Sequence, residues 1–197
     1  MPPQSTNLGK DAVCAHHYSD KCDEYTIVSY NSSEEAKAAG GVITHFGKCG
    51  TCSTRQDLGV YMKYPDMTSV GKTCGIKTLY SMSSSIKCFE DLGMTAPCAR
   101  IWADNAQYDS KNCVVLCLAQ YFSAYNGAYP KCELNACLAC DEKFAGPIFQ
   151  KVAGRTRRNT GLESAITRPC EFVQQLDHEL CPASSLIKDK AQKVYNN

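Results

Sequence analysis

Apolar and polar positions alternate differently in the first quarter of the chain and in the rest. Residues 25–30 (YTIVSY) and 42–46 (VITHF) are rich in β-branched and aromatic side chains, a composition typical of short strands. Beyond about residue 50 the apolar positions recur at helical spacing. Helices are predicted over 53–63, 68–81, 84–92, 95–125 with a break near 104–110, 141–152, 169–176 and 184–194. The pattern therefore predicts an α-rich (α+β) fold with a small two-strand element near residues 25–46.

Capping signals locate two of the predicted helix starts. Ser32 and Glu35 stand in the positions of a capping box, and the glycine pair at 40–41 should end the short helix that follows. A second capping box, Ser53 with Gln56, precedes an apolar helical pattern that runs to about Lys63. The second box places Cys52 at the N-terminus of a helix.

The cysteine content is the most informative feature of the composition. The chain has 197 residues and 14 cysteines, an even number spread from Cys14 to Cys181. Such usage predicts a disulfide-stapled protein of an oxidising compartment, either secreted or in the lumen of the secretory pathway. We expect a flexible N-terminal segment over 1–12 and one disulfide-rich domain over 13–197. The cysteines predicted to be bridged are Cys14, Cys22, Cys74, Cys88, Cys98, Cys113, Cys117, Cys132, Cys137, Cys140, Cys170 and Cys181.

Charge and hydropathy exclude some partners. The formal net charge of +1 provides no basic field for nucleic acid. No apolar run approaches the length of about 18 residues that a membrane-spanning helix needs, so no membrane insertion is expected. Asn31 begins a sequon for N-glycosylation, which suits an exposed loop of a glycoprotein. Composition does not indicate the oligomeric state.

The stretch HFGKCGTCSTRQD, residues 45–57, carries the most suggestive chemistry. Backbone amides and the positive end of the helix dipole favour a thiolate at Cys52 and lower its pKa. His45 is a candidate general base, and Asp57 a candidate orienting group. This interpretation predicts an activated cysteine nucleophile. It competes with the simpler interpretation in which Cys49 and Cys52 each join a distant cysteine.

Two further interpretations of the cysteines remain open at this level. Residues 25–63 show the order strand, short helix, strand, Cys-Gly-Thr-Cys, helix, which resembles a thioredoxin-like domain and implies a thiol–disulfide oxidoreductase. The spacing of Cys132, Cys137 and Cys140 resembles that of plant-type ferredoxins and implies an iron–sulfur cluster. His45, Cys49 and Cys52 are a weaker candidate metal set, and we assign neither a metal nor a cofactor.

A basic loop at 154–161 (GRTRRNTG) is a candidate anion site. Arg155, Arg157 and Arg158 could clamp a carboxylate or phosphate. The same arginines also resemble a furin-type processing site, and a solvated loop is the simplest alternative. Near the only tryptophan, Trp102, the polar residues Asp104 and Asn105 could line a small-molecule pocket, although Trp102 could equally belong to the core.

Together these features leave three classes of function. The first is a small secreted or lumenal enzyme acting on a small anionic molecule, with Cys52 as the activated group. The second is a non-catalytic, disulfide-rich binding or structural module. The third is a redox or metal protein built on the paired cysteines.

Overall fold

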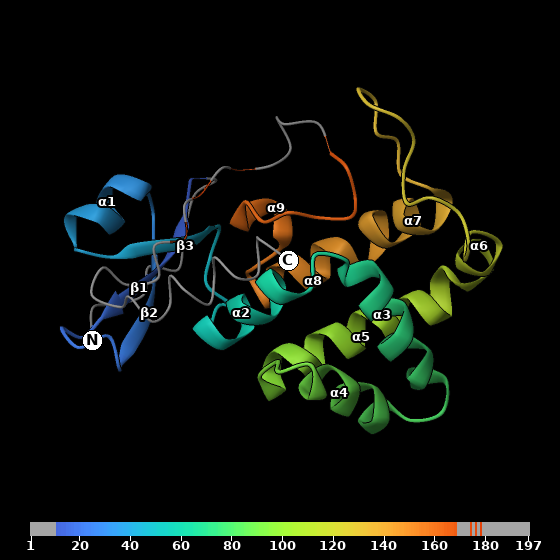
Figure 1. Cartoon of the computed structure of the whole chain (residues 1–197), viewed down its shortest axis with the longest axis horizontal. Helices are drawn as coiled ribbons and strands as arrows, with labels where there is room; N and C mark the ends of the chain where they lie inside the picture. Colours follow the sequence, from blue (N-terminus) through green and yellow to red (C-terminus); the bar gives the residue numbers. More distant parts are fainter. Residues whose placement is uncertain (1–10, 169–173, 175, 177, 179–197) are drawn as a thin grey trace.

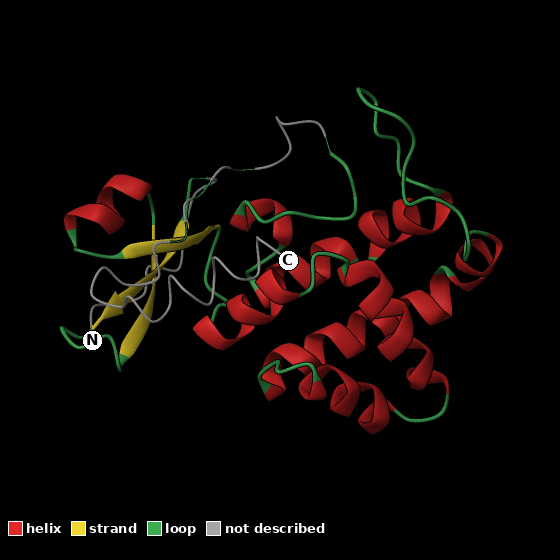
Figure 2. Ribbon diagram, in the orientation of Figure 1, coloured by secondary structure: helices red, strands yellow, loops and turns green. Residues whose placement is uncertain are grey.

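The computed structural model describes residues 11–168 together with 174, 176 and 178. A small sheet and one short helix lie at one end of the molecule, and a group of helices forms the other end (Figures 1 and 2). The fold is helix-rich with a small antiparallel sheet, which confirms the predicted class. The predicted helices at 169–176 and 184–194 fall outside the described residues.

The sheet has three strands where the sequence predicted two. β1 (Val13–Tyr18) lies between β2 (Tyr25–Tyr30) and β3 (Val42–Phe46) and pairs antiparallel with both. Its sequence, VCAHHY, lacks the β-branched run that marks the other two strands, so pattern reasoning missed it. The backbone of the central strand is paired on both edges, and its first four side chains are buried.

Helix α1 (Ser33–Ala38) joins β2 to β3, and Ser32 is its N-cap as predicted. The Ser32 hydroxyl accepts a hydrogen bond from the Glu35 amide at 3.2 Å. The Glu35 carboxylate accepts its hydrogen bond from the Asn31 amide at 2.9 Å, one residue before the amide that the predicted capping box would use. Gly40 adopts φ +74°, the left-handed conformation that ends the helix. Asn31 is exposed at the start of this connection.

The second predicted capping box is wrong by one residue. Helix α2 (Arg55–Lys63) is capped by Thr54, whose side chain accepts a hydrogen bond from the Asp57 amide at 3.0 Å. Ser53 is instead fully buried and turned away from the helix end. The helix therefore starts further from Cys52 than the sequence indicated.

The remaining helices pack around α5. Their bounds are α3 Met67–Gly75, a 3-10 turn η1 Ile76–Leu79, α4 Met82–Asp91, α5 Ala96–Asn112, α6 Val114–Ala119, α7 Ala136–Phe144, α8 Gly146–Ala153 and α9 Arg157–Thr160. Helix α5 is continuous where a break near 104–110 was expected, and the interruption falls at Cys113. Of the polar residues that suggested a break, Asn105 contacts α7, where its amide donates to Asp141 at 3.0 Å.

Two apolar clusters correspond to the two ends of the molecule. The helical cluster includes Leu58, Tyr61 and Phe89, with Trp102 packed against it. The smaller cluster lies between the sheet and α1 and includes Val13 and Ile43. Ala12 is 2% exposed, so the packed domain already includes the last residue of the segment predicted to be flexible. Residues 1–10 of that segment lie outside the described part.

Candidate functional site

Five disulfides staple the described part of the chain. They are Cys14–Cys49, Cys52–Cys98, Cys74–Cys88, Cys113–Cys140 and Cys117–Cys137. Cys22 is also disulfide-bonded. Cys132 was predicted to be bridged, but it is a buried free cysteine. The two cysteines that follow it, Cys137 and Cys140, are bonded to Cys117 of α6 and to Cys113 at the end of α5. Cys170 and Cys181 lie outside the described residues.

These bonds correct the chemistry expected at residues 45–57. Cys52 is bonded to Cys98 and fully buried, so its sulfur is neither a thiolate nor accessible to a substrate. Cys49 is bonded to Cys14, so the two cysteines of the CGTC stretch are not a redox pair in this structure. Two of the three cysteines with ferredoxin-like spacing, Cys137 and Cys140, are also in disulfides and so cannot be cluster ligands. Within the described residues, no group of three or more side chains is arranged to hold a metal.

The CGTC turn instead connects the two ends of the molecule. The amides of Thr51 and Cys52 donate to the carbonyls of Val152 and Ala153, each at 2.9 Å. Gly50 is required for this close approach, because a Cβ there would lie 2.3 Å from the carbonyl oxygen of Val152. One cysteine of the turn then fixes the sheet, and the other fixes the start of α5.

His45 contacts Ser53 and not Cys52. Its Nε2 lies 2.7 Å from the Ser53 hydroxyl, and its Nδ1 lies 2.9 Å from the carbonyl of Phe46. Since a carbonyl can only accept, Nδ1 carries the proton and Nε2 accepts from the hydroxyl. Burial and the nearby charge of Arg155 lower the pKa of His45 to about 3. Both His45 and Ser53 are fully buried, so the pair joins the sheet to the chain before α2 and faces no ligand.

Asp57 also has a structural role. Its carboxylate accepts hydrogen bonds from the Thr95 amide and hydroxyl, both at 2.8 Å, and from the Thr54 hydroxyl at 2.5 Å. Thr95 is the N-cap residue of α5, so the buried carboxylate joins the starts of α2 and α5. The three candidate catalytic residues therefore form no catalytic arrangement.

Arg155 is fully buried, contrary to its predicted place in a substrate-binding loop. Its guanidinium donates to the carbonyl of Thr44 at 2.9 Å, to that of Cys52 at 3.0 Å and to that of Ser53 at 3.3 Å. Arg155, which follows α8, therefore joins β3 to the chain around Cys52. Because Arg155 is inaccessible, the furin-type interpretation of the basic loop is not supported in the folded protein. The expected solvated loop contains the short helix α9, which a Thr156–Asn159 capping box starts.

A cavity among the helices is the strongest candidate site. It has a volume of about 490 Å³ and lies between α3, η1, α5, α6, α7, α8 and the segment after α9. Most of its wall is apolar, with Trp102 and Phe149 in edge-to-face contact at one side. Leu79, Leu118 and Tyr121 line it while remaining 64%, 69% and 48% exposed, so exposed apolar side chains surround its mouth.

A pair of carboxyl groups lies in this apolar wall. Asp109 of α5 and Asp141 of α7 both face the cavity, and the Asn105 amide bridges them. Asn105 Nδ2 donates to Asp141 at 3.0 Å and more weakly to Asp109 at 3.4 Å. Burial and the neighbouring Asp141 carboxylate raise the pKa of Asp109 to about 8, and burial also raises the pKa of Asp141. At neutral pH the pair therefore retains a proton.

Disulfides hold both members of this pair in place. Cys113 lies one helical turn after Asp109, and Cys140 directly precedes Asp141, so the Cys113–Cys140 bond joins the two backbones beside the carboxyl groups. The Cys117–Cys137 bond, whose cysteines line the cavity, makes a second connection between α6 and α7. The wall that carries the carboxyl pair is thus covalently fixed.

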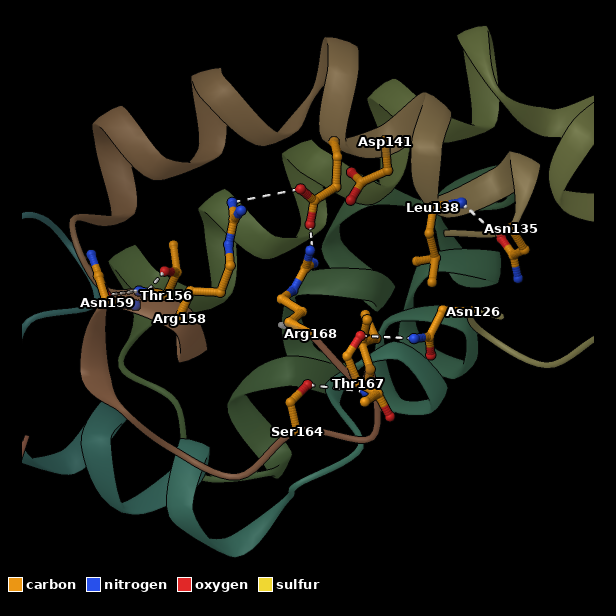
Figure 3. A network of polar contacts seen from close by, with 12 residues as sticks. Asn126, Asn135, Leu138, Asp141, Thr156, Arg158, Asn159, Ser164, Thr167 and Arg168 are labelled. Carbon is orange, nitrogen blue, oxygen red and sulfur yellow. Dashed lines mark hydrogen bonds and ion pairs between the residues drawn. The ribbon is translucent and has the colours of Figure 1, made fainter. Parts of the chain in front are cut away.

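The cationic side chains around the cavity already have hydrogen-bond or ion-pair partners within the protein. Arg158 and Arg168 both point toward the Glu142 carboxylate, with Asp141 beside it (Figure 3). Arg157 donates to the backbone carbonyls of Tyr61 and Tyr64. The fourth cation, Lys72, donates to the carbonyl of Tyr121 at 3.1 Å. Within the described residues, neither carboxyl group of the pair belongs to an ion pair.

The structure brings together four of the six predicted substrate-binding residues. Trp102, Asn105, Arg157 and Arg158 all line the cavity. Asp104 points away from it and forms an exposed ion pair with Arg100 at 2.9 Å. Sequence reasoning missed Asp109 and Asp141, because each looks like an ordinary polar residue of a surface helix. The available signal was helical spacing, which puts Asn105 and Asp109 four residues apart on one face.

Comparisons with known proteins add one partial match. Residues 82–176 match the model of a family of unknown function, DUF8771. This region begins at α4 and includes α5 to α8, and therefore both carboxyl groups. No match was found among curated proteins or among solved structures.

Proposed function

We propose that the protein is a secreted, non-catalytic binding module that holds a small, mainly apolar molecule in the cavity between its helices. The observation that carries this proposal is the cavity itself, about 490 Å³ in volume and lined mostly by apolar and aromatic side chains with a few convergent polar groups. Ligand sites in proteins have this size and composition.

Several features support binding over catalysis. The candidate nucleophile Cys52 is bonded to Cys98, and His45 and Asp57 are committed to structural contacts. Disulfides fix the cavity wall, and pre-organisation of a site reduces the entropy cost of binding. The exposed apolar residues at the mouth favour an apolar ligand over the anionic one that the arginines suggested.

The covalent framework also fits the proposed location. Five disulfides in the described chain are typical of an oxidising compartment. None of the described helices has the length and apolar character needed to cross a bilayer. We therefore also propose that the protein is secreted and glycosylated at the exposed Asn31.

The test is a fluorescence titration with the apolar probe N-phenyl-1-naphthylamine. We expect saturable binding to the native protein, with strong loss in Ala106→Phe, because the new ring fills space beside Trp102 in the cavity wall. Ala139→Phe adds the same ring at an exposed position of α7 that does not line the cavity, and should bind the probe like the wild type. Equal binding by all three proteins would contradict the proposal.

A further inference from the structure

We propose that the ligand of this cavity carries a protonated amine, and that Asp109 and Asp141 bind the amine while the apolar wall holds the rest of the molecule. The inference rests on the proposed binding function and specifies its ligand class. It follows from the geometry of the carboxyl pair and from the distribution of charge around the cavity.

The first argument is an acceptor that lacks a fixed donor. Asp109 Oδ1 is buried and receives no hydrogen bond from an amide, hydroxyl or cation in the described part of the chain, and its carboxyl group is hydrogen-bonded to that of Asp141 through the retained proton. Once this proton leaves, a buried acceptor without a donor costs free energy, and such atoms are rare in folded proteins. An ammonium group provides three donors, enough for this oxygen and for the neighbouring carboxyl oxygens of the pair.

The second argument is charge complementarity. Arg158 and Arg168 are paired with Glu142, and Lys72 lies over the ring of Tyr121 and donates to its carbonyl. Apart from the proton that its two members share, the carboxyl pair has only the neutral Asn105 as a side-chain hydrogen-bond donor among the described residues. In the absence of a ligand, this proton cancels one of the two negative charges, and one carboxylate stays charged. A cationic ligand would replace that proton.

The third argument excludes two other ligand classes. The described residues contain no group of three or more histidine, cysteine or acidic side chains arranged to hold a metal ion. A carboxylate ligand would meet two carboxyl groups in a poorly solvated site and would be repelled by the one that is ionised.

The proposal also predicts that binding of an amine releases a proton. At pH 7 the pair holds a proton that an ammonium group would displace into the buffer, leaving the two carboxylates beside the bound cation. The charged groups that face the pair are Glu142 on α7, Arg168 in the segment after α9 and Lys72 on α3. Glu142 and Arg168 are paired with each other, so the released proton comes from the Asp109–Asp141 pair.

The experiment compares three ligands that differ only in their polar end. Octylamine, octan-1-ol and octanoate are titrated into the full-length protein by isothermal calorimetry at pH 7, in two buffers of different ionisation enthalpy. We expect octylamine to bind about ten- to a hundredfold more tightly than octan-1-ol, as for a charge-assisted hydrogen bond in a buried site. We also expect octylamine binding to release up to one proton per molecule bound.

Variants assign the effect to the carboxyl pair. Asp109→Asn and Asp141→Asn should each lower the ratio of octylamine affinity to octan-1-ol affinity and reduce the proton release. Asp104→Asn removes an exposed carboxylate from the same helix and should behave like the wild type.

The outcomes separate the two proposals. Equal affinity of octylamine and octan-1-ol would overturn the amine inference and leave the binding function standing, and so would a preference for octanoate. Failure of all three ligands to bind would overturn both.

Discussion

Replacing Asp109 with asparagine tests whether the carboxyl pair retains a proton in the folded state. The substitution keeps the size of the side chain, removes its titration and provides an amide that can donate to Asp141. In the unfolded chain an aspartate has its ordinary pKa near 4, whereas the folded pKa of Asp109 is about 8. Between these values the folded wild type holds a proton that the unfolded chain has lost, so the wild type loses stability as the pH rises.

The magnitude follows from proton linkage. One retained proton changes the free energy of unfolding by at most about 1.4 kcal/mol per pH unit, which is about 2.7 kcal/mol between pH 5.5 and 7.5. Asp109 is not completely enclosed, so solvent screening reduces this figure, and we expect about half of it. The stability of Asp109→Asn relative to the wild type should therefore rise by about 1 to 1.5 kcal/mol across this range.

The assay is urea unfolding with the disulfides intact at pH 5.5, 6.5 and 7.5. His16 and His45 titrate in the opposite sense over the acidic part of this range, but they contribute equally to both proteins and cancel in the difference. Asp104→Asn serves as the control and should show no trend. A constant difference between Asp109→Asn and the wild type at all three pH values would refute the assignment of a retained proton to this pair.

Three further predictions test the structural roles of buried residues. Arg155→Leu leaves three backbone carbonyls without their donor, and should lower the free energy of unfolding by about 3–5 kcal/mol in urea; a loss below 1 kcal/mol would contradict the role assigned to this guanidinium. Gly50→Ala should destabilise by about 3 kcal/mol because the new methyl group meets the backbone of α8, whereas Gly59→Ala, with open space around its Cβ, should stabilise slightly; equal thermal midpoints would argue against the close approach. Burial lowers the pKa of His16 to about 4 and that of His45 to about 3, so the unfolded chain takes up protons below pH 6.5 before the folded protein does. Stability should therefore fall as the pH drops from 6.5 to 4, less steeply in His16→Gln, and identical slopes would contradict this cause.

The helices could be predicted from the sequence because their signals are local. Ser32 caps α1 as expected, and the proline in the first turn of α5 marks its start. β1 could not be recognised in this way, because the strand depends on pairing with partners on both sides and not on its own composition. Ser53 and Thr54 show the same limit on a smaller scale: either could cap α2, and the buried contact with His45 decides between them.

Long-range contacts explain why the site differed from expectation. The helix start near Cys52 was a sound local reason to suspect a thiolate, but Cys98, which binds its sulfur, is 46 residues away. Arg155 and Arg157 look alike in the sequence, yet one is buried under the sheet and the other contacts the backbone of α2 and lines the cavity. Trp102 and Asn105 both line the cavity because they are three residues apart on one face of α5, and their role in binding stays a prediction.

The nested arrangement of Cys117–Cys137 inside Cys113–Cys140 has a consequence for the integrity of the chain. Both bonds enclose the excursion between α6 and α7, so a protease that cuts once within this excursion leaves the two halves covalently attached. The fragments would separate only after reduction. A nicked molecule would therefore keep both walls of the cavity in register, and would run as an intact chain in any separation performed without a reducing agent.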